Sequence, residues 1–241
     1  TNPAVTINSV GSNGGKAAAF TSDLARSVVS PRQGNPAYEG QKRDNEIPPI
    51  RSDDLFYPDY VNLDKVAIPQ ADEQQHLLTN IILLSSLHRK PMPHLWFLPS
   101  GFKAAVIMTG DDHANDGDNP ENPHVGTSGT AGRFNEYRDI SSSNTHAAVA
   151  DWQAIRGTSY IYPEVPISND SVKYYQNLGF EIALHPTTYC ENFDKAYLSS
   201  AISSQLAELK TKLADLNSAV TNRTHCMPWS DWATHPKVEI A

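Results

Sequence analysis

The stretch from Lys103 to His113 constrains the fold more than any other part of this chain. Its first half is an apolar run, Ala104–Met108, that is long enough for one buried strand, and its second half ends in the adjacent acids Asp111 and Asp112. Continuous apolar runs bounded by turn signals are typical of strands covered on both faces, as in a parallel α/β sheet or barrel. Functional residues in such folds lie at the carboxyl ends of the strands. Two adjacent carboxylates repel each other unless a cation or an arginine lies close by, so this strand end predicts a charged site.

Strand and helix patterns alternate along the rest of the chain. After a Gly-, Asn- and Asp-rich loop over 114–143, we expect helices over 145–156, 172–178 and 203–220, and strands over 159–165, 180–184 and 222–227. Trp152 should face inward from the first of these helices, and four leucines share one face of the last: Leu206, Leu209, Leu213 and Leu216. Alternating strands and helices predict a parallel sheet or barrel with right-handed crossovers.

The first 69 residues lack this alternation. Residues 1–15 are small and polar and predict a flexible lead-in. A short strand over 16–21 follows, and then a helical turn for which Ser22-Asp23 offers an N-cap. Residues 30–69 are rich in Pro, Gly, Asn and charge, which predicts irregular structure. A helix over 71–89, buried on most of its circumference, comes next. We therefore divide the chain into an irregular extension, 1–69, and an α/β barrel domain, 70–241.

The composition excludes several classes of protein. The chain has 241 residues, a formal net charge of −8 and 39% hydrophobic residues, which is ordinary for a globular domain. An acidic balance argues against nucleic acid or an anionic membrane surface as the main partner. No apolar run is long enough to span a bilayer. The two cysteines exclude a disulfide-rich scaffold but allow one bridge.

Chemically active residues close three of the predicted strands. Asp111, Asp112 and His113 follow the first, His185 follows the strand over 180–184, and Arg223 and His225 belong to the last segment. Strand ends of a βα-repeat fold lie on one side, so we expect these groups to converge. Carboxylate and imidazole ligands together suit zinc, iron, cobalt or manganese, with positions left for water and substrate. A metal beside an unligated carboxylate is suited to hydrolysis, and a nearby arginine would orient that carboxylate.

These residues resemble a known family. Thr109–His113 looks like the Thr-Phe-Asp-Asp-Gly motif of the polysaccharide deacetylases (NodB-like carbohydrate esterases), and Gly179–Pro186 resembles their metal-histidine motif. Arg223 with Pro228-Trp229 resembles their arginine-containing motif. The resemblance spans about residues 102–232, and it depends more on the order and spacing of the motifs than on any single one. It implies a distorted (β/α) barrel and metal-dependent removal of N- or O-acetyl groups from a sugar.

The resemblance also implies roles for individual residues. Asp111 would be the general base, Asp112 and His185 metal ligands, and Arg223 the group that orients Asp111. The family's second histidine is replaced here by Tyr189, so a third ligand must come from elsewhere, with His225 the first choice and His113 the second. The implied cofactor is a divalent metal, zinc first, with cobalt, manganese or iron as alternatives. The residues expected to contact the carbohydrate are Arg133, Tyr189 and Trp229.

The chain departs from the family in other respects. The Leu-x-His motif that supplies the general acid has no match before Ala241, and the last strands are missing, so we expect an incomplete barrel in a truncated or divergent member. Cys190 and Cys226 could form a disulfide beside the site or ligate metal. The segment over 14–37 resembles the closing segment of a glutamine-amidotransferase-like (trehalose-utilisation-type) domain, which implies association with flanking domains.

Three functional hypotheses follow. The first is a secreted or periplasmic, metal-dependent carbohydrate deacetylase or related amidase. The second is a non-catalytic carbohydrate-binding or assembly module on the same fold, which the replaced histidine and the missing strands favour. The third is phosphoester hydrolysis at the same metal site, which is less attractive because the chain has no Gly-rich phosphate cradle and no Lys/Arg cluster.

Overall fold

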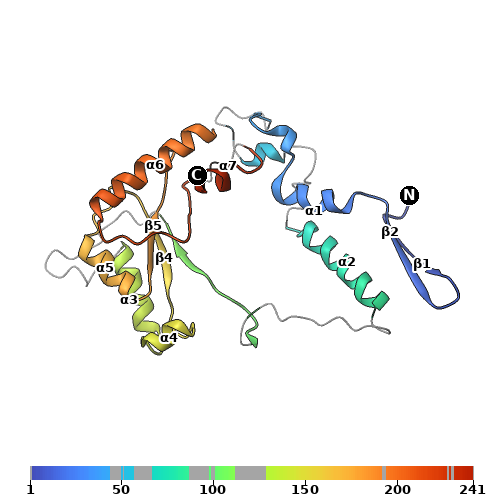
Figure 1. Ribbon diagram of the computed structural model, residues 1–241, viewed down its shortest axis with the longest axis horizontal. Helices are drawn as coiled ribbons and strands as arrows, with labels where there is room; N and C mark the ends of the chain where they lie inside the picture. The colour runs from blue at the N-terminus through green and yellow to red at the C-terminus, as the bar shows by residue number, and fades with distance from the viewer. Residues whose placement is uncertain are drawn as a thin grey trace. The chain divides into compact units, whose positions relative to one another are not determined.

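The chain forms two compact units. The computed structural model describes residues 2–43, 50, 52–56, 67–86, 98, 101–111, 129–191, 194–226, 228 and 231–240 (Figure 1). The first unit comprises residues 1–104 with 230–233, and the second comprises 105–229 with 234–241. Three residues of the predicted site, Asp112, His113 and Trp229, lie outside the described residues.

The first unit begins with a β-hairpin. Strand β1 (Val5–Val10) pairs antiparallel with β2 (Gly15–Phe20), and the register runs from Val5 opposite Phe20 to Val10 opposite Gly15. The short strand expected over 16–21 is confirmed, but the flexible lead-in is wrong. Gly11 and Gly14, at φ of 70° and 74°, form the tight turn that lets the preceding residues pair.

Two helices follow, α1 (Leu24–Gln33) and α2 (Gln70–Ser86), and the described residues between them include the short 3₁₀ turns η1 (Pro36–Tyr38) and η2 (Ser52–Leu55). Of the pair Ser22-Asp23 predicted to cap α1, Asp23 is the cap, and it accepts a hydrogen bond from the backbone N–H of Arg26. The α2 helix packs on α1, and an ion pair joins Arg32 to Asp72. The boundary predicted after residue 69 therefore lies inside this unit.

Burial of α2 differs from the prediction. Among its apolar residues Ala71 and Ile81 are buried, whereas Leu77, Ile82 and Leu84 are exposed. Helix α2 contacts α1 and β2, but these contacts leave part of its apolar stripe exposed, so the expectation of burial around most of the circumference is wrong within this unit.

The second unit is built on a parallel sheet of strand order β3-β4-β5: β3 (Met108–Gly110), β4 (Gly157–Ile161) and β5 (Glu181–Leu184). Its helices are α3 (Gly129–Ile140) and α4 (His146–Ala150) between β3 and β4, α5 (Asn169–Asn177) between β4 and β5, and then α6 (Lys195–Lys212) and α7 (Thr234–Glu239) (Figure 1). This confirms a mixed α/β fold with a parallel sheet. The distorted, incomplete (β/α) barrel stays a prediction, because the described strands of this unit form a sheet of three strands.

The core of this unit lies where three helices meet one face of the sheet. Phe134 of α3 is fully buried and stacks on Phe180, with ring centroids 4.2 Å apart. On the same face a buried hydrogen bond of 2.7 Å joins the hydroxyls of Thr130 and Ser159. The cluster comprises Ala131, Phe134, Ile161, Val165, Ile167, Val172, Tyr175, Phe180, Ile182, Leu184, Leu209 and Leu213. Leu209 and Leu213, predicted to share a face, are both in it.

Several element boundaries differ from the predictions. Strand β3 begins at Met108 rather than near Ala104, because its partner β4 begins opposite Met108, and Val106 and Ile107 are exposed. Helix α4 ends at Ala150, and Trp152 is 73% exposed at φ 59°, so its predicted inward orientation is wrong. The α3 helix occupies part of the predicted loop over 114–143.

The last long helix also begins earlier than predicted. Asp194 caps α6 by accepting from the backbone N–H of Tyr197, so the helix covers Lys195–Lys212 instead of 203–220. Among the residues that the structure describes, none of the helices is both long and apolar enough to cross a membrane.

Candidate functional site

The candidate site lies on the face of the sheet opposite the core. Side chains alternate along a strand, so the face turned away from Ile161, Ile182 and Leu184 carries Tyr160 of β4 and Ala183 of β5. The same alternation, continued past the strand ends, places Asp111 and His185 on this face. We call it the site face. The apolar face is the one packed by α3, α5 and α6.

An extended segment, 220–225, lies along β5 on the site face. It runs in the direction of β5, because the backbone N–H of Val220 donates to Glu181 Oε1 at 2.8 Å and that of His225 donates to Pro186 O at 2.9 Å. Between them Tyr160 Oη donates to Thr221 Oγ1 at 2.7 Å. The strand predicted over 222–227 is wrong as a regular strand over its described part, 222–226, because mainly side chains, and not a continuous backbone ladder, hold this segment to the sheet.

Glu181 anchors the start of the segment. Its carboxylate accepts from the backbone N–H groups of Val220 and Thr221 and from the hydroxyls of Thr221 and Thr158. Partial burial raises the pKa of this carboxyl, but the hydrogen bonds outweigh burial and leave its pKa below the ordinary value. Glu181 was not predicted as a site residue, and its only sequence signal is its position in a strand that His185 follows.

Asp111 and Arg223 form an ion pair on this face. Arg223 Nε donates to Asp111 Oδ2 at 2.6 Å, and the two side chains are 50% and 28% exposed. The residues are far apart in sequence, and the predicted contact between them is present. A charge-assisted hydrogen bond of this length fixes the orientation of the carboxylate.

His185 is held in one tautomer. Its side chain is buried, and Nδ1 lies 2.7 Å from the carbonyl oxygen of Arg223. A carbonyl oxygen can only accept, so Nδ1 carries the proton and the lone pair of the neutral ring is on Nε2. A backbone carbonyl that fixes the ring in this way is the usual second partner of a metal-binding histidine.

His225 faces His185 across the site. Its Nδ1 lies 3.3 Å from His185 Nε2 and 2.9 Å from the hydroxyl of Tyr162. Two imidazole nitrogens bound to one tetrahedral zinc ion lie about 3.4 Å apart, given Zn–N bonds of about 2.1 Å. The observed separation therefore matches either a hydrogen bond from His225 to His185 or two ligands of a single ion.

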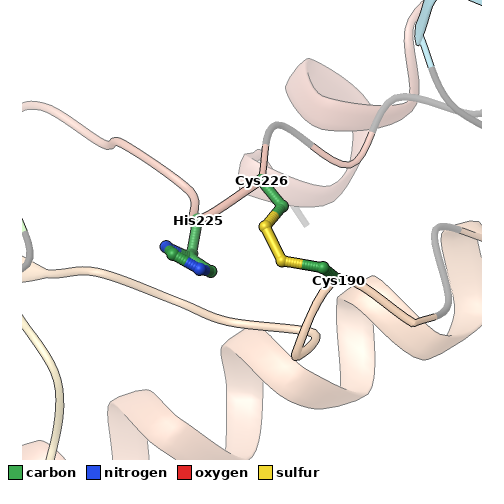
Figure 2. A group of neighbouring side chains, drawn as sticks. All are labelled: Cys190, His225 and Cys226. Atoms are coloured by element: carbon green, nitrogen blue, oxygen red, sulfur yellow. A yellow bond between two sulfur atoms is a disulfide. The ribbon is translucent and has the colours of Figure 1, made fainter.

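A disulfide closes one side of the site. It joins Cys190, in the loop after β5, to Cys226, the neighbour of His225, with Cα atoms 5.6 Å apart. Figure 2 shows the His225 ring beside this bridge, and one ring nitrogen and the two sulfurs lie within 4.8 Å of one another. Of the two alternatives left open for these cysteines, the structure has the disulfide. In the bridged form neither sulfur is a thiolate, so the alternative of metal ligation does not apply to that state.

Tyr189 and Arg133 are the remaining predicted site residues that the structure describes. Tyr189 is adjacent to Cys190 and 71% exposed, with its backbone N–H bonded to Thr187 Oγ1. Arg133 lies in α3, one turn after Thr130, and is partly buried. Tyr162 was missed as a site residue. Its only sequence signal is its place after Tyr160 at the end of a strand, before Pro163.

Comparisons with protein-family models, with curated proteins and with solved structures found no match. What the chain does must therefore be inferred from its own residues.

Proposed function

We propose that this chain is a metal-dependent hydrolase that removes N- or O-linked acetyl groups from a carbohydrate or a related amide. The observation that carries the proposal is the oriented carboxylate of Asp111, paired with Arg223, on the same face as two imidazoles whose nitrogens are 3.3 Å apart. A proton acceptor beside a cation site is what acyl hydrolysis requires.

The residues present fit a divalent metal. His185 offers Nε2 because its Nδ1 is committed to the carbonyl of Arg223, and His225 offers Nδ1 at the spacing of a second ligand. Asp112, outside the described residues, is the carboxylate that the family resemblance supplies as a third ligand. Zinc suits this donor set best, with cobalt, manganese and iron as alternatives. A bound ion of this kind would polarise the acyl oxygen and make a water molecule more acidic.

We assign proton acceptance and the orientation of the site to Asp111 and Arg223. Arg223 engages Oδ2 of Asp111, so we assign proton acceptance from the attacking water to Oδ1. The carbonyl of Arg223 holds His185, which means that one residue orients both the base and a ligand. The disulfide supports a secreted or periplasmic location, because disulfides persist in oxidising compartments.

The test is acetate release from a panel of N-acetylated and O-acetylated oligosaccharides by zinc-reconstituted, disulfide-intact protein. Asp111→Asn should keep its metal and lose about 10²- to 10⁴-fold in kcat/KM, because a general base contributes about that much. His185→Ala should lose the metal itself, as elemental analysis would measure. The matched controls are Asp139→Asn and His146→Ala, which change exposed residues of α3 and α4.

Both controls should retain metal and activity. Absence of stoichiometric metal in the reconstituted wild-type protein would overturn the proposal. Equal loss of metal in His146→Ala and His185→Ala would also contradict it, since binding would then not depend on the site face.

A non-catalytic carbohydrate-binding module is the second candidate, and one observation favours it. Tyr189 presents a largely exposed aromatic ring beside the site, at the position where the related family has a ligand. Aromatic rings provide large, rigid contact areas for ligands. This candidate predicts glycan binding that Tyr189→Ala abolishes and Asp111→Asn preserves, with no acetate released from any member of the panel.

A further inference from the structure

The disulfide and its neighbouring histidine form a second group of metal-ligand types, which shares His225 with the first. We propose that, when the bridge is reduced, Cys190, Cys226 and His225 become a thiolate–imidazole metal site that takes zinc or a similar borderline-soft divalent ion. The proposal does not depend on the proposed hydrolase function.

The geometry of the three residues is already close to that of such a site. One ligand atom from each lies within 4.8 Å of the others, and the cysteine Cα atoms are 5.6 Å apart (Figure 2). Two thiolates on a tetrahedral zinc ion lie about 3.8 Å apart, given Zn–S bonds of about 2.3 Å. Rotation of the two cysteine side chains can provide that separation once the bridge opens. Two thiolates, one imidazole and a water molecule form a known zinc ligand set.

The backbone near each of the two cysteines is held by hydrogen bonds that do not involve the bridge. On the Cys190 side, Gln205 of α6 accepts from the backbone N–H of Thr187 at 3.0 Å and donates to its carbonyl at 2.7 Å. On the Cys226 side, the backbone N–H of His225 donates to Pro186 O at 2.9 Å. Because these bonds do not involve sulfur, the two cysteines should stay near each other after reduction.

The backbone at the bridge has an unfavourable conformation that a crosslink helps to hold. Tyr189, Cys190 and Cys226 all adopt left-handed φ values of 55° to 60°, a conformation that is unfavourable for residues other than glycine. A metal ion bound to both cysteines would replace the crosslink that holds them there.

A dithiol can reduce the bridge between Cys190 and Cys226. The S–S bond breaks and two S–H bonds form, with two electrons and two protons from the dithiol, which becomes a disulfide. The metal then displaces both thiol protons, and the two thiolates neutralise its two positive charges. The reduced form exists in the newly made chain before the bridge closes.

Cobalt(II) is the probe that separates this site from the site of the proposed function, because thiolate ligation gives a near-ultraviolet sulfur-to-cobalt charge-transfer band. The protein is reduced without air by a phosphine, which takes an oxygen atom from water and ends as the phosphine oxide. Reduced wild-type protein should develop the band and saturate at about one equivalent of cobalt, and zinc should remove it. Oxidised protein should show no such band.

Variants assign the ligands. Cys190→Ser and Cys226→Ser should each lose the saturable band, and His225→Ala should weaken cobalt binding. His185→Ala should keep the band, which distinguishes failure of this proposal from failure of the hydrolase proposal. Far-ultraviolet circular dichroism records whether each reduced variant is folded. Reduced wild-type protein that gives no band, whether folded or not, overturns the proposal, as does a band that survives in the double serine variant.

Discussion

The two faces of the small parallel sheet are held by different forces. On the apolar face, α3, α5 and α6 pack non-directional hydrophobic contacts against β4 and β5, with Phe134 and Tyr175 fully buried. On the site face, hydrogen bonds and an ion pair hold the segment 220–225, from Glu181 at one end to His185 at the other. Because side chains alternate along each strand, neighbouring residues of one strand serve stability and chemistry separately.

Because of this difference, substitutions on the two faces should have different effects on stability and activity. Changes on the apolar face should alter the free energy of unfolding and leave the surviving folded protein active. Changes on the site face should alter activity or ligand binding more than their effect on stability explains.

The largest stability effect is expected for Phe134→Ala. Phe134 is fully buried, stacks on Phe180 and meets the ring of Tyr175 edge-on at 5.3 Å, so its removal leaves a cavity in the core. The free energy of unfolding should fall by about 3–5 kcal/mol in chemical denaturation. Trp152→Ala, at an exposed position, is the aromatic control and should change it by less than about 0.5 kcal/mol. Similar losses in the two variants would contradict the assignment of the core.

A smaller effect on stability and a distinct effect on activity are expected for Glu181→Gln. The amide keeps one acceptor oxygen, but its NH₂ group replaces the oxygen that accepts from two threonine hydroxyls. Unfolding free energy should fall by about 1–2 kcal/mol. The segment that carries Arg223 and His225 would lose its anchor, so acetate release should fall further than the folded fraction does. Glu208→Gln, on the exposed side of α6, is the matched control. A Glu181→Gln protein with full activity would show that this anchor does not position the site.

The smallest effect is a pH dependence of stability that depends on the same carboxyl. Hydrogen bonds hold the pKa of Glu181 below its ordinary value in the folded chain. A carboxyl with a lowered folded pKa stabilises the fold fully above its unfolded pKa of about 4.3, and this contribution is lost as the pH falls through the folded value. Urea midpoints measured from about pH 6 to about pH 3 should therefore fall less steeply in Glu181→Gln than in the wild type. Equal slopes in the two proteins would contradict the role of these hydrogen bonds.

Local signals in the sequence predicted local features well. The strand that His185 follows, the helix that stops before Gly179 and the cap at Ser22-Asp23 each depend on neighbours within a few residues, and all three are present. The convergence of Asp111, His185 and Arg223 was also predictable, because strand order in a βα fold brings strand ends together.

Features that depend on distant contacts were not predictable in the same way. Tyr162 joins the site through a hydrogen bond to His225, 63 residues later, and no local pattern marks it. The segment 220–225 lacks a regular strand because the side chains of Glu181 and His185 take the place of a ladder. The sequence pattern predicts that Trp152 faces inward from a helix, but α4 ends before this residue and leaves its side chain exposed.

The most direct measurement is anomalous diffraction at the zinc edge from crystals of the disulfide-intact protein soaked in zinc. We predict one peak within about 2.1 Å of both His185 Nε2 and His225 Nδ1, on the same face as Asp111. No peak there, with His225 Nδ1 hydrogen-bonded to His185 instead, would contradict it.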